Sequence, residues 1–207
     1  MRTLALILAA VALAATACSS GSDSSAEPQP GPAQDTTPTH QSSKHFTKAQ
    51  LPKLALQPSD APRGMRYTKA DSGRMSLADV GFILKRQIAQ VRALKLRGIY
   101  DATFDSKSSD LRLASRLWLF ENADGAQRWL DKTERDSQQF AFEALSSPQL
   151  GDDSWAGYGN LSAQVITYAF RRGNLVVVTA YTTQTEELSQ SAALAAAQKA
   201  AERLETA

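Results

Sequence analysis

The stretch AQVITYAFRRGNLVVVTAYT, residues 163–182, decides the fold. It contains two β-rich runs on either side of Arg172-Gly173-Asn174, a combination that predicts a tight β-hairpin. Alternate residues of a strand point to opposite faces, so the hairpin has a bulky face and a small face. The bulky face holds Ile166, Tyr168, Phe170, Leu175, Val177 and Tyr181, and the small face holds Val165, Thr167, Ala169, Val176, Val178 and Ala180. Because both faces are largely apolar, we predict a central hairpin that is covered on both sides.

Working outward from the hairpin, the apolar periodicity predicts further strands and helices. Small residues on the small face of the hairpin favour the close approach of a helix. The alanine-rich segment 186–204 is predicted to form a helix and is the candidate to cover that face. The pattern predicts strands at 65–71, 99–105 and 111–120, a short strand around Trp155, and helices at 46–56, 77–98 and 123–138. We therefore predict an α+β fold, a mostly antiparallel sheet of about five to six strands flanked by helices on both faces.

The N-terminus predicts export. Arg2 precedes an uncharged apolar run, 4–17, that has the length of a signal-peptide core and is shorter than the roughly 20 residues of a membrane span. Ala15-Thr16-Ala17 followed by Cys18 fits a lipobox, in which the cysteine is acylated by palmitate and becomes the new N-terminus. The alternative is ordinary cleavage after Ala17 and secretion. We expect a signal peptide at 1–17 and a protein anchored on the outer face of the cell membrane.

Residues 18–45 are rich in Ser, Pro, Gly, Gln and Thr and have almost no aliphatic side chains after the cysteine. A segment of this composition cannot bury enough apolar surface to order itself, so we expect a disordered tether. Residues 46–207 remain as a single extracytoplasmic domain, which is long enough for a core of its own.

The predicted domain lacks the side chains of many catalytic sites. Both histidines, His40 and His45, precede it, and Cys18 is the one cysteine of the chain. These absences exclude Ser-His-Asp and Cys-His catalysis and the usual zinc ligands within the domain. Asp152-Asp153 is the best carboxylate pair, but GDDS is typical of a solvated turn. We predict no catalytic residue, no metal site and no cofactor.

Two surfaces are candidates for a ligand or a partner. On the predicted strand 111–120 the leucines point to one face of the sheet and a second set of side chains points to the other. If that second face is open, these side chains would form a ligand groove. If helices cover it, they would be core residues with snorkelling arginines. This set is Arg112, Arg116, Trp118 and Phe120. Trp155 and Tyr158 lie among glycines in a predicted loop and indicate a contact surface.

Basic residues are concentrated in the first half of the domain. Residues 48–97 contain eleven Lys or Arg against three Asp, whereas residues 98–207 contain ten against fifteen Asp or Glu. The predicted helix 77–98 and the residues at its end carry Lys85, Arg86, Arg92, Lys95 and Arg97. They are candidates for contact with anionic lipid or a cell-wall polymer, with a solvated helix face as the alternative. Nucleic acid is not expected, because interleaved aromatic residues are lacking.

Five phrases follow one another in an order that resembles a known family: LQPSDAPRGM, RGIYDATF, LWLFENADGAQRWL, PQLGDDSWAG and YAFRRGNLVVVTAY. After a lipobox and a spacer, they resemble small exported bacterial lipoproteins of mostly unassigned function. These are related to PsbP-like domains and to the extracellular sensor domains of some bacterial kinases. The resemblance implies an antiparallel sheet with flanking helices and a binding or sensing role, and it brings no catalytic residue.

Three functions stay open. The first is a lipid-anchored binding or sensor-like module without catalytic activity, whose partner is an anionic lipid, a cell-wall polymer or a protein. The second is a carrier of lipid or lipoprotein, which requires an internal apolar cavity. The third is a hydrolase that uses carboxylates alone and requires two carboxyl groups in one cleft.

Overall fold

The structure is a computed structural model, and it describes residues 44–79, 85–140, 142–160, 162–185 and 187–207, with only the backbone for residues 85–87. The predicted signal peptide, Cys18 and nearly all of the predicted tether lie outside the described residues. Within the described residues, no helix is long and apolar enough to cross a membrane.

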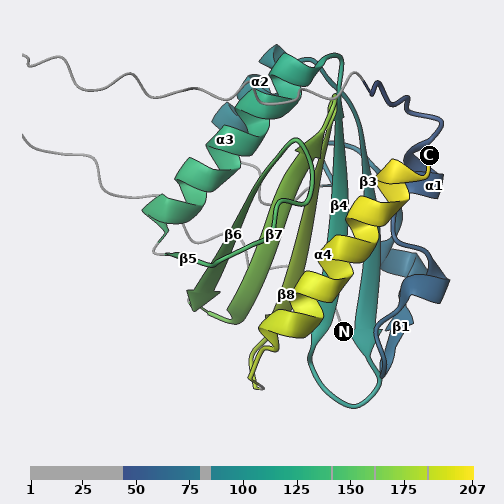
Figure 1. The fold of residues 1–207 in the computed structure, drawn as a ribbon, viewed down its shortest axis with the longest axis vertical. Helices are drawn as coiled ribbons and strands as arrows, with labels where there is room; N and C mark the ends of the chain where they lie inside the picture. The colour runs from purple at the N-terminus through teal and green to yellow at the C-terminus, as the bar shows by residue number, and fades with distance from the viewer. Residues whose placement is uncertain (1–43, 80–84, 141, 161, 186) are drawn as a thin grey trace, which may run out of the picture.

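The described chain forms one antiparallel sheet of eight strands (Figure 1). The order is β1-β3-β4-β8-β7-β6-β5, and β2 also pairs with β3. The strands are β1 (Met65–Tyr67), β2 (Gly73–Met75), β3 (Leu96–Ser106), β4 (Arg112–Phe120), β5 (Glu143–Ala144), β6 (Asp153–Asn160), β7 (Gln164–Arg172) and β8 (Leu175–Thr183). The predicted α+β class is confirmed, and the sheet has more strands than the five to six expected.

The central hairpin has the predicted faces. Ile166 pairs with Tyr181 and Phe170 with Val177, so the bulky side chains lie together. The turn is Gly173-Asn174. Gly173 has φ 55°, a left-handed conformation that favours glycine, and a Cβ there would lie 1.8 Å from the carbonyl oxygen of Lys44.

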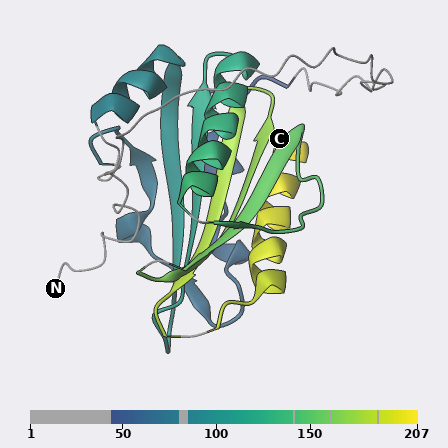
Figure 2. The ribbon, with the colours of Figure 1, turned by 90° about the vertical axis from the view of Figure 1, so that its left-hand side faces the viewer.

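Helices cover both faces of the sheet, with α2 and α3 on one side and α4 on the other (Figure 2). The helices are α1 (Leu51–Leu54), α2 (Lys85–Ala93), α3 (Ala123–Gln139) and α4 (Gln190–Glu205), with short 3-10 turns η1 (Pro58–Asp60) and η2 (Lys69–Asp71). α3 begins as its sequence predicts, because the side chain of Asn122 accepts a hydrogen bond from the Gly125 amide at 2.9 Å.

The assignment of α4 to the small face was wrong. Its alanines, Ala193 and Ala197 among them, pack in one buried cluster with Tyr168, Phe170 and Leu117 from the bulky face. Small helix residues and large strand residues are complementary in volume, and this complementarity explains the choice of face.

α3 packs on the small face instead. Trp129 of α3 lies against Trp118 of β4, with ring centroids 4.9 Å apart, and against Phe120 at 6.4 Å. Val176 and Ala169 complete this cluster beneath the helix. Each large buried side chain contributes about 1.5–3 kcal/mol, so this aromatic cluster holds α3 in place.

The chain before β3 differs most from its prediction. The expected helix 46–56 is reduced to α1, and the expected strand 65–71 ends at Tyr67 and is followed by η2 and then β2. The predicted helix 77–98 is helical over Lys85–Ala93, and residues 80–84 lie outside the described residues. Short segments depend more on tertiary contacts than on their own periodicity, which explains the discrepancy.

Candidate functional site

The helices that the structure describes cover the small face of the sheet only in part. In Figure 2 the strands continue well beyond the end of α3. Five side chains on this part of the face are half-buried, and four of them belong to β7 and β8, which have a paired strand on each side. We call this surface the open floor, and it consists of Ala114, Val165, Val178, Ala180 and Thr182.

Strand register shows what borders the open floor. Trp155 of β6 pairs with Ala169, Ala169 with Val178, and Val178 with Arg116 of β4. These four residues therefore form one row across the sheet, about 14 Å long at the usual strand spacing. A tryptophan and an arginine stand at the two ends, with small side chains between them.

The arginine border is held by acidic neighbours. Arg116 donates two hydrogen bonds to Asp101, at 2.7 and 2.6 Å, and its guanidinium carbon lies 5.8 Å from the ring centre of Trp118. Arg112 donates to Asp105 at 2.7 Å and to Asp71 at 2.9 Å. These arginines are rigid hydrogen-bond donors whose charge is largely balanced by the paired carboxylates.

The ion pairs also affect titration. Burial acts to raise the pKa of Asp105, but hydrogen bonds from Arg112 and Thr68 outweigh it and hold that pKa below its ordinary value. Asp105 therefore stays ionised into the acid range, and its ion pair with Arg112 persists there.

Trp118 and Phe120 do not reach the open floor. They are 4% and 0% exposed and lie beneath α3. One strand thus contributes core at one end and an accessible border at the other: Trp118 and Phe120 are core, and Arg112 and Arg116 are partly exposed.

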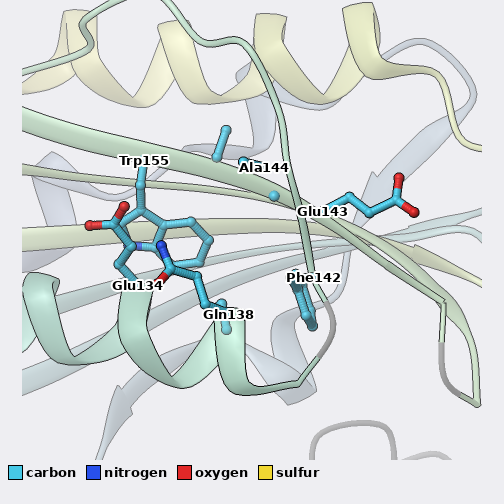
Figure 3. A pocket seen from close by; sticks show the side chains of 9 residues that line it. Glu134, Gln138, Phe142, Glu143, Ala144 and Trp155 are labelled. Atoms are coloured by element: carbon cyan, nitrogen blue, oxygen red, sulfur yellow. The ribbon is translucent and has the colours of Figure 1, made fainter.

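Trp155 forms the opposite border and is half-buried. Its indole nitrogen donates to Oγ1 of Thr133 on α3 at 3.2 Å, which fixes the ring. Figure 3 shows the ring beside the side chains of Glu134 and Gln138, and all three residues line a small pocket. Phe142, on the same pocket, packs over Gly157 and Gly159 of β6, where a Cβ on Gly159 would meet its ring at 2.6 Å.

Tyr158 lies on the other face of the sheet. It pairs with Ile166 and packs against the cluster beneath α4. Residues three apart in a strand point to opposite faces. The structure therefore separates Trp155 from Tyr158, because the loop expected around them is the strand β6.

The predicted basic cluster is only partly described. The side chains of Lys85 and Arg86 lie outside the described residues, and Arg92 is exposed on α2. Lys95 and Arg97 both bind Glu121, Lys95 at 2.9 Å. The hydrogen bond from Lys95 is the main reason that the pKa of Glu121 is below its ordinary value. Glu121 thus balances part of the positive charge that the sequence places here.

Asp152 is not in a solvated turn, which corrects the prediction for GDDS. It is 5% exposed and accepts hydrogen bonds from Arg171 at 3.0 Å and from the Gly173 amide at 2.8 Å. Arg171, itself 2% exposed, also donates to Gln127 of α3 at 2.6 Å. Asp152 therefore joins the hairpin turn to the preceding loop as one half of a buried ion pair.

Sequence reasoning missed Glu134, Phe142 and the floor residues as parts of a site. The small face of the hairpin was the available signal, but it was interpreted as a helix-packing surface. Among the described residues, no group of three or more His, Cys, Asp or Glu is arranged to hold a metal ion.

These features define the class: an α+β domain whose sheet is covered by α4 over the centre of one face and by α3 over part of the other. No protein-family model matches the sequence, and no curated protein matches it. Among solved structures, the fold is similar to the extracellular domain of PknH from Mycobacterium tuberculosis. The TM-score is 0.56 with 13% sequence identity, covering 78% of this chain and 98% of that one. At this identity the likeness shows the fold, as the resemblance to kinase extracellular domains implied; the PsbP-like part of that resemblance stays a prediction.

Proposed function

We propose that this protein is an exported, non-catalytic binding module that is anchored through an acylated Cys18 and binds its ligand on the open floor. The observation that carries the proposal is the half-burial of Val178 and Ala180 in the middle of the sheet: Val178 lies in the row between Arg116 and Trp155, and Ala180 in the row beside it. An apolar surface in a central strand that the described helices leave partly uncovered is typical of a binding site.

The chemistry of the borders supports binding over catalysis. Arg112 and Arg116 are engaged with carboxylates, so they can offer hydrogen bonds in fixed directions while the small floor side chains provide apolar contact. The fold likeness to an extracellular domain agrees with a position outside the cytoplasm.

The two described pockets give the carrier alternative no support. The pocket at Trp155 has a volume of about 30 Å³. The second, about 370 Å³, is an open groove between residues 148–150 and α4, and two glutamates, Glu202 and Glu205, help to line it. A lipid carrier needs an enclosed apolar cavity of several hundred Å³.

Native mass spectrometry of the protein purified from its own host tests the proposal. The parent should carry a ligand, and the N-terminal fragment should show an acylated Cys18. Ala180→Trp fills the open floor and should remove the ligand. Ala195→Trp, on an exposed position of α4, should keep it. Equal ligand occupancy in the two variants would show that the ligand binds elsewhere.

A further inference from the structure

The pocket at Trp155 has a chemistry of its own. Nine residues line it, from the last turns of α3, from Phe142 and β5, and from β6. They include two glutamates, Glu134 and Glu143, and no lysine or arginine. In Figure 3 the side chain of Glu134 lies beside the indole ring of Trp155, whereas Glu143 points away from it.

Three features of this pocket favour a positive charge. The face of an indole attracts cations more strongly than other aromatic side chains do, and the hydrogen bond to Thr133 holds this ring in place. Glu134 forms no ion pair within the part of the chain that the structure describes. The pocket also lies against the C-terminal end of α3, where the helix dipole is negative.

The size of the pocket distinguishes between cations. Its volume is about 30 Å³, and about 10–15 Å³ by this measure holds one water, so the pocket has room for a compact group such as an ammonium. A planar guanidinium or a quaternary ammonium is larger and fits it less well. The geometry therefore favours the tip of a lysine side chain.

The surroundings indicate how such a lysine would be presented. The pocket is lined in part by β5, a strand of two exposed residues at the edge of the sheet, which within the described part of the chain pairs with β6 alone. An exposed edge offers backbone hydrogen bonds to an extended polypeptide, and side chains of that polypeptide then enter neighbouring pockets.

We propose that this pocket binds the ammonium group of a lysine on a partner polypeptide that lies along β5. The inference rests on the proposed binding function, and it adds the identity of one recognised group. The lysine site and the open floor meet at Trp155, so one partner can contact both.

The test uses the full chain and Nα-acetyl-lysine N-methylamide as the probe, with the matching norleucine and arginine compounds for comparison. The indole N–H resonance of Trp155 reports binding by NMR, and the indoles of the buried Trp118 and Trp129 serve as internal controls. The lysine probe should shift the Trp155 resonance saturably, the arginine probe more weakly, and the norleucine probe not at all.

Glu134→Gln should weaken lysine binding about two- to fivefold, the effect expected of one exposed carboxylate. Glu187→Gln removes the same charge from an exposed position outside the pocket and should leave binding unchanged. Equal shifts with the lysine and norleucine probes, or an unchanged affinity in Glu134→Gln, would overturn the inference. In that case a native ligand that is lost from Ala180→Trp would still support the proposed function.

Discussion

Replacing Asp152 by Asn tests the buried ion pair that joins the hairpin turn to the loop before β6. The substitution keeps the size of the side chain and one oxygen for the Gly173 amide. It removes the negative charge opposite Arg171, whose side chain is 2% exposed. Arg171 would keep Gln127 and the Gly173 carbonyl as hydrogen-bond acceptors but would lose its carboxylate.

The expected cost follows from this burial. Removing one partner of a buried ion pair typically lowers the free energy of unfolding by about 3–5 kcal/mol, because the remaining charge is left uncompensated. A domain of this kind is stable by about 5–15 kcal/mol in total. Asp152→Asn should therefore remove a large share of the stability without touching the open floor.

Urea unfolding followed by circular dichroism measures the effect. With a slope of about 1–3 kcal/mol/M, the midpoint should fall by about 1 M or more. Asp153→Asn is the matched control, because Asp153 is exposed and its substitution should cost less than about 1 kcal/mol. In an Arg171→Gln background, Asp152→Asn should cost much less than alone, since the charge that it would strand is gone. Equal midpoints for Asp152→Asn and Asp153→Asn would refute the reasoning.

Three further predictions concern the anchor, the N-terminal segment and pH. Cys18→Ser should abolish membrane retention without changing the folding of residues 46–207, and unchanged partitioning into detergent would contradict the anchor. Asn174→Ala removes the buried hydrogen bonds of this side chain with the amide and carbonyl of Phe46 and with the Phe120 carbonyl. The substitution should lower the free energy of unfolding, measured by thermal unfolding, by about 2–4 kcal/mol. A loss under about 1 kcal/mol would contradict this prediction. Burial acts to raise the pKa of Asp60, but hydrogen bonds from Arg203 and the Gln57 amide keep it below its ordinary value of 3.8. The ionised Asp60 carboxylate therefore stabilises the fold above about pH 4, and this stabilisation is lost as the pH falls through the lowered pKa. The difference in free energy of unfolding between Asp60→Asn and the parent should shrink from pH 7 to pH 3. A constant difference would exclude this linkage.

The candidate site could be predicted only in part, and β4 shows why. Alternation along this strand placed Arg116 and Trp118 on the same face, as the register confirms. It could not show that α3 covers Trp118 and leaves Arg116 partly exposed. That difference depends on where α3 crosses the sheet, which no local pattern encodes.

Asp152 shows that sequence patterns have the same limit in predicting which charged residues are buried. In the sequence GDDS has the composition of an ordinary turn. In the structure, Asp153 pairs with Arg171 across β6 and β7, and this register brings the Arg171 side chain to Asp152. The two residues are 19 positions apart. Only the packed sheet brings them together, away from water.

The sequence by itself determined the α+β class, the central hairpin and its two faces, because turn chemistry and a period of two are local properties of the chain. It also predicted an exported module without His or Cys chemistry in its domain. Tertiary structure alone decided that α4 packs on the bulky face and that α3 leaves the open floor partly uncovered. It also brought Trp155 beside Glu134. The reason is physical: which helix covers which face depends on complementary volumes of segments far apart in the chain, and the sheet becomes accessible where that cover ends.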